Sequence, residues 1–283
     1  MRTVIVTGAG QGLGRAHALA FAAAGHHLVL NDLSAEALDA LAKEIGGDVV
    51  TVPGDIADWD FAAALVGRAV EAFGRLDALV NNAGLVRDRM FTNVTEDEWD
   101  AAVRVNLKGH AAPLRHAAAY WKAQAKAGTP VAARVVNTTS GAGLLGSVGQ
   151  ANYSAAKAGV AALTLVAAAE LQRYHVCVNA IAPSARTQMT EVAFADAMRA
   201  PSSGFDAMAP ENVSPLVVWL ASEEAGDVTG RVFEVAGGQV SVADGWRHGP
   251  AADAGRRWEP AELGPVVRSL IADAPAPEAV YGA

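Results

Sequence analysis

Thr7-Gly8-Ala9-Gly10-Gln11-Gly12-Leu13-Gly14 is the stretch that decides the fold, because a strand-like run leads directly into it and an Ala-rich helical pattern follows it. Backbone N–H groups at a helix start, together with the partial positive charge there, favour a pyrophosphate. Gly8, Gly12 and Gly14 form a G-x3-G-x-G spacing, which differs from the G-x-G-x-x-G of the ordinary dinucleotide fold. A tight strand-to-helix turn that binds no ligand would have the same sequence features. The surrounding sequence must therefore distinguish a phosphate-binding loop from a structural turn.

The rest of the chain alternates short apolar runs with longer helical patterns. Strands are predicted at 2–7, 27–31, 48–52, 76–81, 132–137, 175–181 and 231–235, and helices at 13–24, 35–45, 58–73, 95–126, 151–172 and 211–222. Nearly continuous apolar strands are typical of a parallel sheet that helices cover on both faces. We therefore expect an α/β, doubly wound, Rossmann-like sheet of seven parallel strands, with one domain over 1–238 and a partly irregular C-terminal extension over 239–283.

Composition narrows the function class. A net charge of −8 repels a phosphate backbone, and no basic patch is evident, so we expect no nucleic-acid partner. Cys177 stands alone in an apolar run, which excludes an intrachain disulfide and fits a reducing compartment. The first strand leaves no room for a signal peptide, and no uncharged apolar stretch of membrane-spanning length is seen. No histidine has partners at a metal-like spacing. The expectation is a cytoplasmic protein without a metal or membrane partner.

Asp32 closes the second predicted strand, 18 residues after Gly14. A carboxylate there can accept hydrogen bonds from the adenosine ribose hydroxyls and would repel a 2′-phosphate. Neither Gln11 nor Leu33 supplies a positive charge that would attract that phosphate. NAD is therefore expected, with NADP less favoured. An alternative is that Asp32 only caps the helix that begins near Ser34.

Asp55 follows the third predicted strand. It could accept a hydrogen bond from the adenine amine, with help from the Ile56 backbone. A loop aspartate is also a common turn former, so this assignment stays open here.

Tyr153 and Lys157 lie one helical turn apart in Tyr153-Ser-Ala-Ala-Lys157, so their side chains project from one face of the helix. A phenol is a poor base at neutral pH, and a nearby ammonium lowers its pKa by stabilising the phenolate. Ser140 follows the fifth predicted strand, at the edge where open α/β sheets bind ligands, and its hydroxyl can polarise a substrate oxygen. The pair alone is common on helix faces, and only its combination with the glycine loop indicates chemistry.

Together these residues resemble the short-chain dehydrogenase/reductase family, in register from Thr3 to about Gly238. The resemblance rests on Thr7–Gly14, Asn81-Asn82-Ala83-Gly84, Asn106 within Val103-Arg-Val-Asn-Leu-Lys-Gly109, and Ser140 with Tyr153 and Lys157. It implies that Tyr153 exchanges the proton, Ser140 orients the carbonyl, Lys157 holds the nicotinamide ribose and tunes the tyrosine, and Asn106 anchors a relay water. The implied cofactor-binding residues are Gly8, Gln11, Gly12, Leu13, Gly14, Asp32, Leu33, Asp55, Ile56, Asn82, Ala83, Gly84, Tyr153, Lys157, Pro183 and Thr187. It also implies a homotetramer joined through the helices near 95–126 and 151–172.

One position departs from the family pattern. The family has Pro-Gly after the sixth strand, whereas this chain has Pro183-Ser184. The departure puts the local backbone shape near the nicotinamide in doubt.

The run Gly149-Gln-Ala-Asn-Tyr-Ser-Ala-Ala-Lys157 looks like the dehydrogenase part of peroxisomal multifunctional enzymes, which oxidise (3R)-hydroxyacyl-CoA thioesters or steroid alcohols. The small and aliphatic segment 141–149 suits such an apolar alcohol, ketone or acyl thioester. The leading hypothesis is thus NAD-dependent oxidation of a hydroxyacyl-CoA or a hydroxysteroid. An NADPH-dependent 3-oxoacyl thioester reductase and a non-catalytic dinucleotide-sensing protein are the alternatives. Trp246 and Trp258 lie in the loose C-terminal stretch and suggest docking on the body or on a neighbouring subunit.

Overall fold

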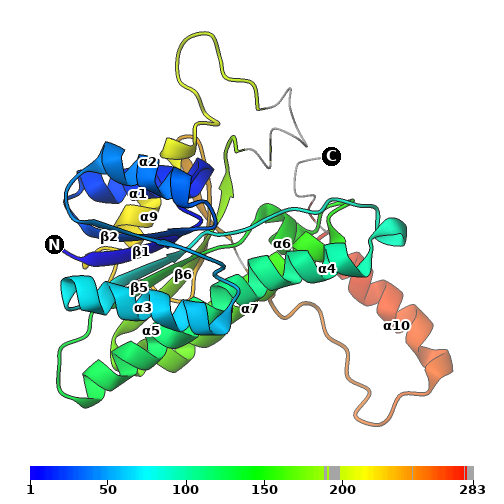
Figure 1. Cartoon of the computed structure of the whole chain (residues 1–283). Coiled ribbons are helices and arrows are strands. Elements are labelled where there is room, and N and C mark those ends of the chain that lie inside the picture. The colour runs from blue at the N-terminus through cyan, green and yellow to red at the C-terminus, as the bar shows by residue number, and fades with distance from the viewer. Residues whose placement is uncertain (188–189, 191–197, 244, 277, 279–283) are drawn as a thin grey trace.

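Eight strands form one sheet in the order β3-β2-β1-β4-β5-β6-β7-β8 in the computed structural model, which describes residues 1–187, 190, 198–243, 245–276 and 278 (Figure 1). The strands are β1 (Thr3–Thr7), β2 (His27–Asp32), β3 (Val49–Pro53), β4 (Ala78–Asn81), β5 (Ala133–Thr138), β6 (Val176–Ser184), β7 (Val232–Ala236) and β8 (Gln239–Ala243). The first seven pair in parallel, which confirms the predicted sheet.

The eighth strand was missed. β8 runs antiparallel to β7, and Ala236 pairs with Gln239, so only Gly237-Gly238 makes the turn. Gly237 has a φ of 54°, a left-handed conformation that glycine adopts at little cost. Two glycines between short apolar runs are a hairpin signal, and they mark this strand in the sequence. The domain boundary at 238 stays a prediction, although β8 belongs to the sheet.

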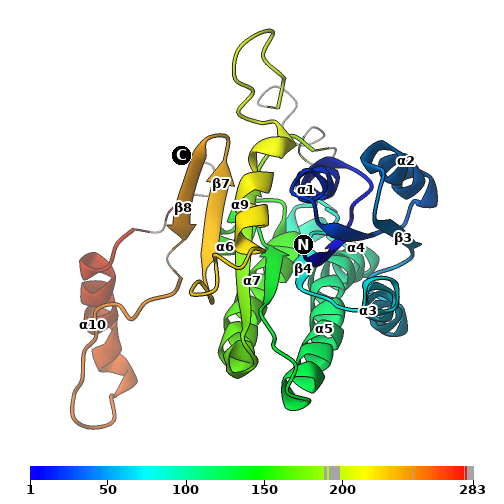
Figure 2. The same cartoon turned by 90° about the vertical axis from the view of Figure 1, so that its left-hand side faces the viewer.

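Helices cover both faces of the sheet (Figures 1 and 2). Val4 and Val6 of β1 contribute to one apolar core with α1 (Gly12–Ala23), α2 (Ala35–Ile45) and α9 (Ser214–Leu220). Ile5, on the opposite side of the same strand, contributes to a second core with α3 (Trp59–Phe73), α5 (Gly109–Lys126) and α7 (Ala151–Leu171). Alternate residues of a buried strand thus serve two layers, which explains the continuous apolar runs.

The order of the strands reverses between β1 and β4, which are neighbours in the sheet. The chain leaves β1 toward α1 on one face and reaches α3 and α5 on the other, so a crevice opens at the carboxyl ends of these strands. This crevice is where the predicted site residues lie.

The single helix predicted over 95–126 is interrupted. It consists of α4 (Glu96–Val103), a π-helical segment η2 (Arg104–Lys108) and α5. Thr95 caps its start in a capping box with Glu98. The Asn106 side chain donates to the Ala102 carbonyl at 2.9 Å and so takes an acceptor of the helical ladder, which accounts for the local widening.

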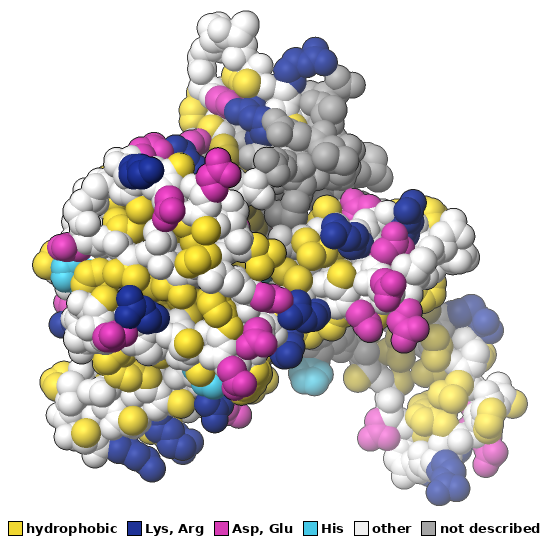
Figure 3. Space-filling model, viewed as in Figure 1, with side chains coloured by type: hydrophobic (Ala, Val, Ile, Leu, Met, Phe, Trp, Pro, Cys, Tyr) yellow, Lys and Arg dark blue, Asp and Glu magenta, His cyan; other side chains and the backbone are white. Residues whose placement is uncertain are grey.

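The C-terminal region forms a helix that the sequence did not predict, α10 (Pro260–Asp273). α10 stands away from the body of the chain, and none of its residues is buried (Figures 2 and 3). Trp246 is fully exposed, so it does not dock on the body of its own chain. Within the predicted extension over 239–283, residues 244, 277 and 279–283 lie outside the described residues.

The helical run Ala151–Tyr174, which joins α7 to a short 3-10 turn, is long and apolar enough to cross a membrane. Its Val160, Ala167 and Ala168 are buried, and α7 covers β6 and β5. Packing against the sheet accounts for this buried face, whereas Leu165 and Val166 on the outer face are more than half exposed.

Candidate active site

A cavity of about 360 Å³ lies at the carboxyl ends of the strands. This volume lies within the range of small-molecule sites. It is lined by every predicted site residue except Gly14: Gly8, Gln11, Gly12, Leu13, Asp32, Leu33, Asp55, Ile56, Asn82, Ala83, Gly84, Asn106, Ser140, Tyr153, Lys157, Pro183 and Thr187. The topology thus brings together residues that are up to 179 positions apart, from Gly8 to Thr187.

The glycine loop forms one end of the cavity. Gly12 opens α1 with a φ of 53°, which favours glycine there. Gly14 lies behind the cavity wall, and a Cβ on it would come within 1.9 Å of the Gly8 carbonyl oxygen. Gly14 therefore allows helix and loop to pack closely and does not meet a ligand directly.

Asp32 lies beside this loop at the end of β2. Its Oδ2 accepts the Gly10 N–H at 2.9 Å, and its Oδ1 accepts the Ser34 N–H at 3.1 Å. Ser34, not Asp32, caps α2 by accepting the Ala37 N–H. Each carboxylate oxygen accepts one hydrogen bond and can accept a second, so the side chain can still bind ribose hydroxyls.

Asn82 shapes the floor of the cavity. Its amide donates to the carbonyls of Thr7 and Gly8 at 3.0 and 3.1 Å, while the Thr7 hydroxyl accepts the Asn82 and Ala83 N–H groups. These bonds join the loop after β1 to the loop after β4. Asn82 thus holds the glycine loop in place.

Ser140 follows β5 and caps α6 (Gly141–Leu145), where its Oγ accepts the Ala142 N–H at 3.2 Å. A Cβ on Gly143 would lie 2.6 Å from the Cβ of Lys157. Only glycine lets α6 pack this closely on α7, and this packing brings Ser140 to the same cavity as the first turn of α7.

Lys157 is fully enclosed at the back of the cavity, 2% exposed. Its Nζ donates to the Thr138 carbonyl at 2.8 Å and lies 5.7 Å from the centroid of the Tyr153 ring. Burial lowers the pKa of Lys157 to about 7, since the charged form loses its hydration. An ammonium at this distance stabilises a Tyr153 phenolate, and the phenolate in turn stabilises the ammonium.

Asn106 faces Lys157 across Gly84. A Cβ on Gly84 would lie 2.7 Å from Asn106 Oδ1 and 3.6 Å from Lys157 Nζ. The Asn106 amide brackets the Leu85 backbone, donating to its carbonyl at 2.7 Å and accepting its N–H at 3.3 Å. The side chain therefore fixes the segment after β4.

Pro183-Ser184 does not distort the site. Ser184 is the last residue of β6 and pairs with Ala236, and its φ is not positive. A glycine is therefore not required, so the departure from the family pattern leaves the backbone intact. Beyond it, Thr187 lines the cavity and accepts and donates hydrogen bonds with Thr190.

The cavity is also lined by residues that were not predicted as site residues: Asn31, Gly54, Leu85, Val86, Val105, Thr138, Thr139, Gln150, Ser184, Ala185, Thr190 and Met198. Half of them directly adjoin predicted residues in the sequence, and for these residues the adjacency is a signal. Arg87 and Arg89 do not line the cavity, and Arg89 pairs with Glu98 at 2.9 Å.

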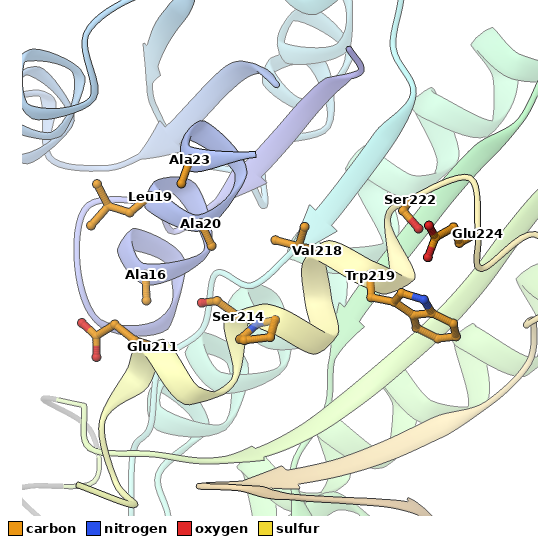
Figure 4. Close-up of a pocket in the computed structure, with 11 residues that line it drawn as sticks. Ala16, Leu19, Ala20, Ala23, Glu211, Ser214, Val218, Trp219, Ser222 and Glu224 are labelled. Atoms are coloured by element: carbon orange, nitrogen blue, oxygen red, sulfur yellow. The ribbon is translucent and has the colours of Figure 1, made fainter. Parts of the chain in front are cut away.

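A second hollow lies between α1 and α9 (Figure 4). Its wall is mostly alanine and aliphatic carbon, with Trp219 on one side and Glu211 and Glu224 at the ends. No pair of groups suited to proton transfer faces it. Among the described residues, no cluster of metal-ligating side chains is found either. The cavity at the strand ends is therefore the candidate active site.

Comparison with known proteins agrees with this geometry. A family model described as short chain dehydrogenase matches residues 2–197. The hydroxyacyl-CoA dehydrogenase ChsB1 of Mycobacterium tuberculosis is 46% identical over 284 residues, which cover 96% of this chain and 89% of the relative. The peroxisomal multifunctional enzyme type 2 of Mus musculus is 39% identical over 254 residues, which cover 84% of this chain but 32% of the mouse protein. A crystal structure of a short chain dehydrogenase from Mycobacterium avium matches all of this chain and 98% of its own, with a TM-score of 0.92 and 59% identity.

Proposed function

Because this chain belongs to the short-chain dehydrogenase family and is an oxidoreductase that acts on CH–OH groups, we propose that it uses NAD(H) to oxidise the secondary alcohol of a 3-hydroxyacyl-CoA thioester. One observation carries the proposal: the glycine loop with Asp32 and the group of Ser140, Tyr153 and Lys157 line the same cavity. A dinucleotide held at one end places its reactive ring at the other.

The residues present fit this cofactor. Gly8 and Gly12 line the cavity without a side chain, beside the start of α1, where the first backbone N–H groups have no partner within the helix and can bind phosphates. Among the described residues that line the cavity, Lys157 is the one basic side chain, and it lies at the catalytic end. Asp32 would thus repel a 2′-phosphate, and no basic side chain lines the cavity beside it to offset the repulsion, which favours NAD over NADP.

The chemistry that bound NAD⁺ would supply is acceptance of the hydride from the carbinol carbon. The chain's own residues handle the proton. Tyr153 takes it from the substrate hydroxyl, Ser140 donates a hydrogen bond to the same oxygen, and Lys157 stabilises the phenolate. Asn106 keeps the segment in front of Lys157 in place, so that water can reach the ammonium.

The substrate follows from the relatives and from the cavity wall. The name of the 46% identical relative is that of a hydroxyacyl-CoA dehydrogenase. In this chain Leu85, Val86, Ala185 and Met198 make the wall apolar. A hydroxysteroid is the other apolar alcohol that such a wall would accept.

We also propose a cytoplasmic homotetramer. Leu165 and Val166 on the outer face of α7 are 51% and 55% exposed, and the helices α5 and α7 lie side by side on this face of the sheet (Figure 1). Light scattering after size-exclusion chromatography would reveal the mass of four chains. A monomer would contradict this part of the proposal.

The test of the proposed reaction is a matrix of initial rates. NAD⁺ and NADP⁺ are each paired with (3R)-3-hydroxybutyryl-CoA, a longer (3R)-3-hydroxyacyl-CoA and a hydroxysteroid. The highest kcat/KM is expected for NAD⁺ with a hydroxyacyl-CoA. A strong preference for NADP⁺ would contradict the role of Asp32 and favour a 3-oxoacyl thioester reductase. Turnover of the steroid alone would overturn the thioester assignment.

A further inference from the structure

An ion pair lies at the end of the cavity that Asp55 lines, although Arg104 itself does not line the cavity. Arg104 donates from its guanidinium to Asp55 Oδ2 at 2.5 Å. Asp55 lies in the loop after β3, whereas Arg104 opens η2, 49 positions later. Their sequence neighbours Ile56 and Val105 both line the cavity, so the pair joins two of its walls.

The ion pair leaves acceptor positions on the Asp55 carboxylate unused. Asp55 Oδ1 accepts the Ala57 N–H at 2.9 Å, and Oδ2 accepts from Arg104. A carboxylate has about four acceptor positions, so two remain for a ligand in the cavity that Asp55 lines. Burial raises the pKa of Asp55, but the hydrogen bonds from Arg104 and Ala57 and the charges of Arg104 and Lys108 outweigh it and keep the pKa below its usual value. The group is therefore an acceptor only.

Stability does not explain the pair. The side chains of Arg104 and Asp55 are 47% and 39% exposed. Ion pairs this open to solvent contribute about 0–1 kcal/mol. Its consequence lies in geometry: the Ala57 N–H holds Oδ1 and Arg104 holds Oδ2, so without Arg104 the orientation of the carboxylate would depend on one hydrogen bond alone.

We propose that Arg104 is a positioning residue for adenine recognition, holding the Asp55 carboxylate so that it accepts a hydrogen bond from the exocyclic amine of the cofactor's adenine. The inference rests on the proposed function, in which the adenosine half of NAD(H) occupies this end of the cavity. Asp32, at the end of the neighbouring strand β2, then meets the ribose, and Asp55 meets the base.

The experiment compares NADH with reduced nicotinamide hypoxanthine dinucleotide, in which a carbonyl oxygen replaces the adenine amine. The two probes carry the same charge, so removing the charge of Arg104 affects their binding equally, and their ratio reports the amine contact. Dissociation constants are measured by the fluorescence of the reduced nicotinamide. The wild type should bind NADH at least about tenfold more tightly than the hypoxanthine dinucleotide, as a hydrogen bond to a charged group predicts.

Arg104→Gln should reduce this preference for NADH to less than about threefold, mainly by weakening the binding of NADH. Arg104→Lys, which can still pair with the carboxylate, should retain part of the preference, and a merely structural role would not produce this graded order. Arg68→Gln is the matched control, because Arg68 forms an exposed ion pair with Glu71 on α3 and should leave the preference unchanged. Thermal unfolding of each variant shows whether it is folded.

Two failures are distinguishable. If the wild type binds both dinucleotides equally, Asp55 does not meet the amine, and the placement of the cofactor in the proposed function is wrong. If the wild type discriminates and Arg104→Gln discriminates equally well, the positioning role of Arg104 is overturned while the cofactor placement stands.

Discussion

Replacing Lys157 with methionine should stabilise the folded chain at neutral pH even as it removes activity. Burial lowers the pKa of Lys157 from its usual value of 10.5 to about 7. The unfolded chain therefore binds more protons than the folded chain between these values, and the free energy of unfolding rises with pH across this window. This difference in the pKa of Lys157 between the unfolded and folded chain lowers the free energy of unfolding by about 4 kcal/mol at pH 7 and by about 1 kcal/mol at pH 9.5.

The substitution also removes a hydrogen bond. Without the ammonium, the Thr138 carbonyl loses the donor that lies at 2.8 Å. An unsatisfied buried carbonyl costs about 1–3 kcal/mol. The variant should thus be about 1–3 kcal/mol more stable than the wild type at pH 7, and this advantage should shrink by about 3 kcal/mol by pH 9.5.

Urea unfolding followed by circular dichroism at both pH values measures these differences. Lys122→Met is the matched control, because Lys122 is exposed on α5, and its effect should not change with pH. A Lys157→Met effect that is the same at both pH values would refute the reasoning, since the buried charge would then not be the cause.

Three further outcomes are expected. Gly14→Ala should destabilise the fold by about 1–3 kcal/mol and weaken NADH binding, because its Cβ would meet the Gly8 carbonyl; unfolding and fluorescence titrations check both. Trp121→Ala should cost about 3–5 kcal/mol of stability by urea unfolding, because this buried side chain fills the core and donates to the Leu76 carbonyl at 2.7 Å. Asp32→Asn should raise the ratio of kcat/KM for NADP⁺ over NAD⁺ by about tenfold or more; an unchanged ratio in initial-rate assays would count against the repulsion argument.

Much of the fold was predictable because both faces of the sheet are covered. A strand such as β1, with Val4, Ile5 and Val6 all buried, leaves a continuous apolar run that alternating patterns do not mimic. β8 was missed for the opposite reason, since its Val240 and Val242 are more than half exposed and the strand is marked only by its turn. α10 was missed because its apolar residues lie on no core.

The candidate site divides in a similar way. Residues with a chemical signature, such as Ser140, Tyr153 and Lys157, are visible because their types and spacing point to proton transfer. Gly143 and Arg104 carry no such signature. Gly143 packs against Lys157, 14 positions later in the sequence, and Arg104 pairs with Asp55, 49 positions earlier. Only the tertiary structure shows these contacts.

The most direct test of the account is the rate of a single turnover in Tyr153→Phe, measured with saturating NAD⁺ and the preferred hydroxyacyl-CoA, beside the dissociation constant for NADH. Loss of the phenol should slow hydride transfer by about 10²–10⁴-fold while NADH binding stays within about twofold, since the cofactor's phosphates are held at the glycine loop. Tyr174→Phe, at the far end of the same helical run and outside the cavity, should react like the wild type. A Tyr153→Phe variant that turns over at a rate close to the wild type would contradict the assignment of Tyr153 as the proton acceptor.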